Sequence, residues 1–93
     1  MSAKFFVHHV NDNVGVAVED IGRGEEVQGW LMDNNTFITI KAVSDIPLGH
    51  KIALAPIAAG EKVVKYGESI GRATASIGPG EHVHTHNLKS ARW

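Results

Sequence analysis

The sequence predicts a compact, mostly β domain with short strands and glycine-rich turns, and three observations support this class. Short segments rich in β-branched and aromatic residues recur along the chain, and most of them alternate apolar and polar side chains. No segment carries a sustained helical period. Ten glycines in 93 residues, together with asparagine and aspartate clusters, supply the tight turns that such short strands require.

The expected strands follow in chain order, and each ends near a turn signal. They cover residues 5–8, 14–18, 37–43, 50–54, 62–66 and 81–86. The run from Thr36 to Val43 alternates most clearly. The clusters at residues 11–13 and 33–35 predict turns. Gly67 and Gly71 bracket residues 68–70, where we expect a short bend.

A seven-residue phrase recurs four times, in the form Ile-x-x-Gly-(Glu or His)-x-(Val or Ile). It reads IGRGEEV, IPLGHKI, IAAGEKV and IGPGEHV, and its glycines are Gly24, Gly49, Gly60 and Gly80. Glycine adopts a positive φ at little cost, so each phrase predicts a tight turn that leads into a strand. The copies start at unequal intervals, which excludes a regular solenoid. Glutamate occupies the fifth position in three copies, and we expect it to serve the turn.

The composition limits the function classes. The length suits one domain over residues 1–93, and a formal net charge of -1 offers no basic surface for nucleic acid or for an anionic membrane. The chain contains no cysteine, which excludes disulfides, thiolate metal sites and thiol nucleophiles. No segment is apolar for long enough to be a signal peptide or to span a bilayer. We therefore expect a cytoplasmic protein.

The segment GEHVHTHN places His82, His84 and His86 at every second position near the end of the chain. Alternate side chains of a strand share a face, so the three imidazoles would project together. Two imidazoles at this spacing can reach one metal ion if a further ligand converges. The alternative is a solvated strand face without chemistry.

Two further segments are candidates for binding. In Gly49-His50-Lys51, histidine stands where the other copies of the turn have glutamate. Either a local functional demand or an exposed position that tolerates any polar residue explains this change. In Lys65-Tyr66-Gly67, a buried lysine would act as a base or hold a carboxylate, whereas a lysine at a strand end is more often solvated.

Together these segments resemble the N-terminal SAF domain of the altronate and galactarate dehydratase family. The resemblance is strongest from Ile46 to Asn87 and rests on three motifs, GHK from Gly49, KYGxxIGxA from Lys65 and HxHN from His84. It implies a β-clip fold. It also implies a part in a lyase that removes a β-substituent from a 2-hydroxy or sugar acid, with a divalent metal that is often iron. Such chemistry needs a base for the proton α to the carboxylate and an acid that helps the leaving group depart.

The resemblance also assigns roles to individual residues. It implies that His84 and His86 are catalytic and contribute to the metal site. The residues that it implies for substrate binding are Asn87, His50, Lys51, Lys65 and Tyr66. His82 matches a variable position of the family, so a structural or solvated role is expected for it.

In the dehydratases, the SAF domain precedes a much larger catalytic region. One explanation is therefore a small subunit of a two-component lyase that eliminates sulfite or water, of the sulfolactate sulfo-lyase or altronate dehydratase type. The other is an N-terminal fragment of a single-chain dehydratase. The ending at residues 87–93, with two cations and a terminal aromatic residue, is typical of a docking tail and favours a small subunit.

The expected partners follow from the first explanation. They are a large catalytic lyase subunit, which would hold most of the metal's ligands, and a small anionic hydroxy acid. The isolated chain is also a candidate for forming homo-oligomers through the surface meant for its partner. A non-catalytic SAF module that binds sugar acids is the alternative from a different class.

Overall fold

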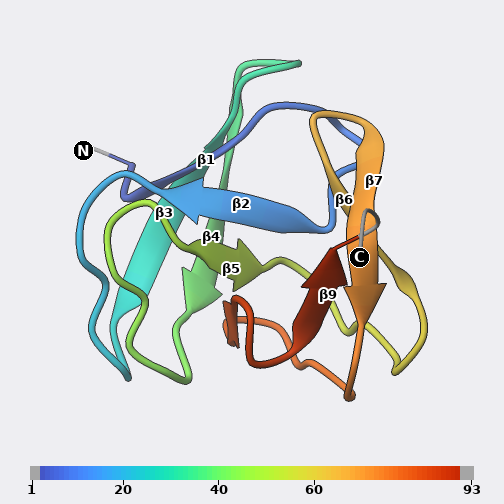
Figure 1. Ribbon diagram of the computed structural model, residues 1–93. Coiled ribbons are helices and arrows are strands. Elements are labelled where there is room, and N and C mark those ends of the chain that lie inside the picture. Colours follow the sequence, from blue (N-terminus) through green and yellow to red (C-terminus); the bar gives the residue numbers. More distant parts are fainter. Residues whose placement is uncertain (1–2, 91–93) are drawn as a thin grey trace.

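The structure is a computed structural model that describes residues 3–90, and these residues form nine strands and no α-helix. The mostly β class is confirmed (Figure 1). Within the described range, no helix is long and apolar enough to cross a membrane. Residues 91–93 of the predicted docking tail lie outside the described residues.

The larger sheet has six strands in the order β4-β3-β1-β2-β5-β8. Its strands in chain order are β1 (Phe5–Val7), β2 (Val14–Ala17), β3 (Glu26–Leu31), β4 (Thr36–Lys41), β5 (Lys51–Ala53) and β8 (His82–Val83). β1 runs parallel to β3, and all other neighbours are antiparallel. The short strands β5 and β8 end this sheet beside the smaller one, and both lead into the candidate site.

The smaller sheet has three antiparallel strands, β6 (Lys62–Lys65), β7 (Glu68–Ala73) and β9 (Leu88–Ser90), with β7 in the middle. A two-residue turn joins β6 to β7, and Tyr66 and Gly67 adopt φ values of 57° and 73° in it. Two successive positive φ values are typical of a type I′ hairpin turn. The buried Asp12 carboxylate accepts both amides of this turn, at 3.0 and 2.7 Å.

Two expectations about strands are wrong. Residues 68–70 begin β7 instead of forming a bend, because the two-residue turn before them starts an antiparallel ladder, whose register shifts between Val63 and Val64. The phrase from Ile21 predicted a strand after its turn, and β3 lies there, although its range was not among the expected strands. A Cβ at Gly29 would lie 1.9 Å from the buried Phe5 ring, so this position has to lack a side chain. The expected strand at residues 81–86 ends at Val83.

The four repeated turns form two pairs. Ile21 and Ile46 exchange two backbone hydrogen bonds of 2.9 and 2.8 Å, and Ile57 and Ile77 exchange two of 2.8 Å. At most 2% of each isoleucine is exposed. The turn glycines have φ values between 81° and 88°, as the phrase predicted. Each pair therefore closes two distant parts of the chain on each other through its backbone.

An alanine four residues before each isoleucine completes the pairing. In every turn the glycine amide donates a 2.8 Å hydrogen bond to the alanine carbonyl that precedes the partner turn, in the pairs Gly24–Ala42, Gly49–Ala17, Gly60–Ala73 and Gly80–Ala53. All four alanines are buried. The repeated unit is thus Ala-x-x-x-Ile-x-x-Gly, which extends the seven-residue phrase by four residues toward the N-terminus.

The glutamate of three turns closes its own turn. Its side-chain oxygen accepts the amide of the residue after the isoleucine, at 2.9 Å for Glu25, 2.9 Å for Glu61 and 3.3 Å for Glu81. The expected turn role of these glutamates is confirmed. In the second turn the residue after the isoleucine is Pro47, which has no amide hydrogen to donate. A glutamate in place of His50 would therefore find no such partner.

Each pair of turns belongs to one hydrophobic cluster. The first cluster lies in the larger sheet and contains Phe5, Val7, Ala17, Ile21, Val27, Ala42, Ile46 and Ile52. The second lies between the two sheets and contains Val14, Ala53, Ile57, Val63, Ala73, Ile77 and Val83. The candidate site is built over the second cluster, on rigid strands and turns.

Candidate active site

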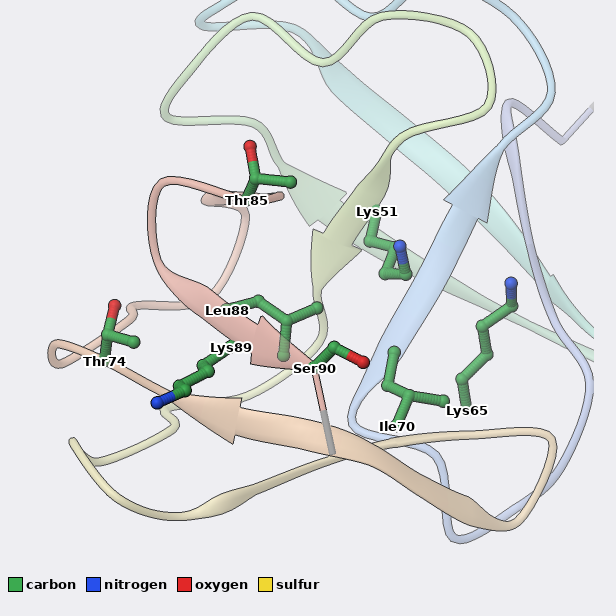
Figure 2. A pocket seen from close by; sticks show the side chains of 8 residues that line it. All are labelled: Lys51, Lys65, Ile70, Thr74, Thr85, Leu88, Lys89 and Ser90. Atoms are coloured by element: carbon green, nitrogen blue, oxygen red, sulfur yellow. The ribbon is translucent and has the colours of Figure 1, made fainter. Parts of the chain in front are cut away.

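An open cleft of about 700 Å³ lies between the two sheets (Figure 2). Its lining residues come from β5, β6, β7, the residue after β7, β9 and the turn before β9, and they are Lys51, Lys65, Ile70, Thr74, Thr85, Leu88, Lys89 and Ser90. Ile70 and Leu88 pack on the second hydrophobic cluster and form an apolar floor. Cations and hydroxyl groups surround this floor, which suits a small anionic, hydroxylated molecule.

Lys51 and Lys65 make the cleft electropositive. Figure 2 shows their ammonium groups on the same side of the cleft, while the Lys89 ammonium is directed toward the other end. Among residues 3–90, no carboxylate lines the cleft, and the one salt bridge joins Lys4 to Glu25. Burial of the ammonium and then repulsion from Lys65 lower the pKa of Lys51. A bound anion would relieve both effects.

Three histidines gather beside the cleft. His50 stands directly before β5, His82 lies on β8, and His84 follows β8. The His50 Nδ1 and His82 Nε2 atoms lie 2.8 Å apart, and the His50 and His84 rings stack with centroids 4.0 Å apart. One ring nitrogen from each histidine falls within 4.8 Å of those of the other two. This donor set of imidazoles fits a divalent first-row transition metal, for which imidazole is a preferred ligand.

Burial and neighbouring charges lower the pKa of His82 and of His84. Partial burial of the ring is the first cause that lowers the pKa of His82, followed by repulsion from His50, His86 and His84. For His84, desolvation and then the neighbouring His50 and Lys51 lower the pKa. A neutral imidazole offers a lone pair, so either side chain can accept a proton or bind a metal at neutral pH.

Asn87 holds the turn that presents His84. Its Oδ1 accepts the His84 amide at 3.0 Å, and its Nδ2 donates to the His82 carbonyl at 2.8 Å. Only 5% of Asn87 is exposed. Because this turn replaces the expected strand, His82, His84 and His86 do not share one strand face. The structure gives Asn87 a positioning role, and substrate contact by its side chain stays a prediction.

The structure brings four of the predicted site residues to the cleft or its edge, and it places His86 and Tyr66 elsewhere. Lys51 and Lys65 line the cleft, and His50 and His84 lie in the histidine cluster beside it. His86 is exposed, lies outside that cluster and packs its ring on His82 with centroids 5.1 Å apart. Tyr66 is 56% exposed and packs on His8 instead of lining the cleft. Catalysis by His86 and substrate binding by Tyr66 stay predictions.

Sequence reasoning missed His82 because its match to a variable position argued against a role. The structure places it within the cluster, hydrogen bonded to His50. A local signal for this cluster exists in the sequence. Pro47 has no amide hydrogen for a glutamate side chain to accept. The residue at position 50 therefore has no role in closing the turn, and it is a histidine, which can bind a metal.

Comparison with known proteins identifies the family. Residues 3–91 match the family model described as the altronate/galactarate dehydratase SAF domain. This chain belongs to that family. The resemblance found in the sequence motifs is confirmed, and the SAF domain accounts for almost the whole chain.

Individual relatives of this SAF chain fall into two kinds. The α subunit of (2R)-sulfolactate sulfo-lyase from Chromohalobacter salexigens is 45% identical, with all of both chains covered. The corresponding subunit from Paracoccus pantotrophus is 49% identical over 66% of this chain and 90% of its own. Altronate dehydratase from Escherichia coli is 46% identical over 88% of this chain but only 15% of its own length. Both lyase subunits and dehydratases therefore carry this domain.

Proposed function

We propose that this chain is the small, α-type subunit of a two-component lyase that eliminates sulfite or water from a 2-hydroxy or sugar acid, with sulfolactate as the first candidate substrate. The match to a sulfo-lyase α subunit over the full length of both chains carries this proposal. The dehydratases, in contrast, align over a small fraction of their length. An N-terminal piece of a single-chain dehydratase is the competing reading, and that difference in coverage weighs against it.

The cleft supports an anionic substrate. Lys51 and Lys65 offer two ammonium groups, the described part of the lining contains no competing carboxylate, and both substrate classes carry at least one carboxylate. Charge-assisted hydrogen bonds to such a group are stronger than neutral ones. In this proposal Lys51 and Lys65 bind the acid group, while the hydroxyl groups of Thr85 and Ser90 contact the polar remainder of the molecule.

The histidines support the proton transfer that elimination requires. A base removes the proton α to the carboxylate, the C–H electrons form a C=C bond, and the substituent on the neighbouring carbon leaves with its bonding pair. The resulting enol becomes a 2-keto acid. His86, which is exposed and lies outside the group of His50, His82 and His84, is the proposed base and would reach the substrate from the partner's side. His84, which borders the cleft through Thr85, is proposed to act on the same substrate as a metal ligand.

We further propose a divalent metal in the assembled enzyme, with iron as its identity and with the large subunit supplying any protein ligands that this chain does not. The donor set of His50, His82 and His84 supports a contribution from this chain. Such an ion polarises a substrate oxygen and stabilises the negative charge that develops on it. The subunit name of the relatives supports a large partner subunit, and the lack of cysteine is compatible with a cytoplasmic location.

The proposal is tested by co-expressing the chain with a candidate large subunit. Sulfite release from sulfolactate and 2-keto acid formation from altronate are then measured on the purified pair. Activity that requires both chains is expected, and the preferred substrate identifies the leaving group. Substrate binding without turnover, with every candidate partner, would instead favour a non-catalytic sugar-acid-binding module.

Two lysines of one strand provide a matched comparison for the cleft. Lys65→Ala removes a cleft ammonium and should raise KM by about tenfold or more, because a charged hydrogen bond is worth about 1.5–3 kcal/mol. Lys62 lies on the same strand, but its side chain is exposed and does not line the cleft. Lys62→Ala should leave KM unchanged. Equal changes in KM for the two variants would contradict a role of Lys65 in substrate binding.

A further inference from the structure

The histidine cluster combines three ring nitrogens that the fold brings together from distant parts of the chain. His50 and His82 are 32 residues apart in sequence, yet their Nδ1 and Nε2 atoms lie at hydrogen-bond distance. His84 completes a group whose ring nitrogens all lie within 4.8 Å. The chain contains six histidines, so half of them occupy this one place.

The backbone of each of these histidines is held by its own hydrogen bond. The His50 amide donates to the Pro47 carbonyl at 2.9 Å, and the His82 amide donates to the Ser44 hydroxyl at 3.0 Å. The His84 amide donates to Asn87 at 3.0 Å. The cluster is therefore built on fixed backbone positions, which reduces the entropy lost when the three rings bind one ligand.

We propose that His50, His82 and His84 form a binding site for one divalent first-row transition metal ion, which this chain holds before it meets its partner. The inference deepens the proposed lyase function and rests on it only for the role of the ion. An imidazole donor set selects zinc, iron, cobalt or nickel over magnesium or calcium, which prefer oxygen ligands. The ion replaces the hydrogen bond between His50 and His82, and the half-buried rings rotate about their Cβ–Cγ bonds to direct three lone pairs at it.

The proposed metal site lies directly beside the cleft, where a bound ion can contact the substrate. Lys51 follows His50 and Thr85 follows His84, and both of these neighbours line the cleft. An ion held by three protein ligands keeps coordination positions for substrate or water. An anionic substrate in the cleft can then direct its acid group to the lysines and an oxygen to the ion.

The turn chemistry is the independent reason for assigning the site to His50 and not to His86. In three turns, the side chain at the position of His50 closes its own turn. Pro47 makes this impossible in the second turn, and the imidazole there contacts His82 and His84 instead. His86 touches only His82 within the histidine group, through its ring.

The test is a titration of the 93-residue chain with cobalt(II) and with zinc(II), followed by calorimetry and by the visible absorption of bound cobalt(II). A one-to-one isotherm and a ligand-field absorption band are expected. His50→Ala, His82→Ala and His84→Ala should each weaken binding at least tenfold, while His86→Ala and the distant His8→Ala should leave Kd within about twofold. Amide NMR spectra of each metal-free variant show whether its fold is kept.

Two results would overturn the inference. The first is wild-type chain that gives no saturable binding of either ion. The second is a folded His86→Ala variant that loses as much affinity as His50→Ala, since this would restore the His84–His86 pair as the metal site. Lyase assays of the assembled pair are scored separately. Metal binding without lyase activity contradicts the proposed function alone, whereas lyase activity without metal binding by this chain contradicts the metal site alone.

Discussion

The second repeated turn differs from the other three in one respect, although all four share the same backbone. Turns beginning at Ile21, Ile57 and Ile77 close themselves with a glutamate side chain. The turn at Ile46 keeps the glycine, the buried isoleucine and the paired backbone hydrogen bonds, but it has proline and histidine at the two positions that form the closure elsewhere.

The second turn shows where the fold tolerates the loss of a local interaction. The backbone bonds to the paired turn hold it, together with the bond from the Leu48 amide to Asp20, and its fifth position carries a side chain of the histidine cluster. The fourth turn contributes from the other side, because Glu81 closes the turn and the next residue, His82, enters the cluster. Structural and candidate functional residues thus alternate within a single repeated phrase.

The largest loss of stability is expected at Gly80, which we compare with Gly24 at the same position of the repeated phrase. A Cβ at Gly80 would lie 2.0 Å from the Lys41 carbonyl oxygen, whereas a Cβ at Gly24 meets nothing within 4 Å. Both have a positive φ, which costs a residue with a Cβ about 1–2 kcal/mol. Gly24→Ala should lose only that amount in urea-induced unfolding. Gly80→Ala should lose at least about 3 kcal/mol, since backbone strain adds to it. Equal losses would contradict the close approach at Gly80.

The second-largest loss of stability is expected at Asn87, whose side chain holds the turn after β8 by two hydrogen bonds. Asn87→Ala removes two buried hydrogen bonds and should cost about 2 kcal/mol in thermal unfolding. It should also weaken cobalt(II) binding, because the turn that presents His84 is no longer held. Asn11→Ala, at an exposed position in the turn before β2, is the control and should change neither property. Unchanged metal affinity in a destabilised Asn87→Ala variant would separate this brace from the histidine cluster.

A third effect compares a self-closed turn with the second turn directly. Glu61→Ala leaves the Ala58 amide without its acceptor and should cost about 1 kcal/mol, as for the loss of a helix cap or a single hydrogen bond. His50→Ala leaves no amide unpaired, because Pro47 has none to lose. Its unfolding free energy in guanidinium chloride, measured without metal, should stay within about 0.5 kcal/mol of wild type. A larger loss for His50→Ala than for Glu61→Ala would give His50 a structural role.

The smallest change in stability tests whether Pro47 and His50 together account for the missing side-chain closure of the second turn. Pro47→Ala restores the missing amide and His50→Glu restores its acceptor, so the double variant should close the second turn like the others. A double-mutant cycle of unfolding free energies should give a favourable coupling of about 0.5–1 kcal/mol. Zero coupling would mean that proline and histidine are unrelated at these positions.

Much of the fold was predictable because it depends on local chemistry. The phrase around Gly24, Gly49, Gly60 and Gly80 predicted turns with positive φ, and all four have it. Alternation predicted most of β1, β2, β4, β5 and β6. The range of β3 could not be assigned from alternation, because Gly29 weakens the pattern. Gly29 lies against the Phe5 ring, which comes from a different strand. β8 was predicted too long, since the turn after Val83 depends on the buried Asn87 amide.

The candidate site was also predictable only in part. Residue types and motifs were enough to single out His50, Lys51, Lys65 and His84, and the structure brings the two lysines to one cleft and the two histidines to its edge. The importance of His82 could not be inferred, because its contact with His50 crosses 32 residues of sequence.

Glycine, proline and asparagine act on their own backbone or on that of near neighbours. The turns, the strand class and the family motifs could therefore be derived from this sequence alone. Which turn pairs with which, and which histidine meets which, is decided only when the two hydrophobic clusters form. Burial of the four isoleucines is shared between distant segments, and no segment carries within itself the partner that it will pack against.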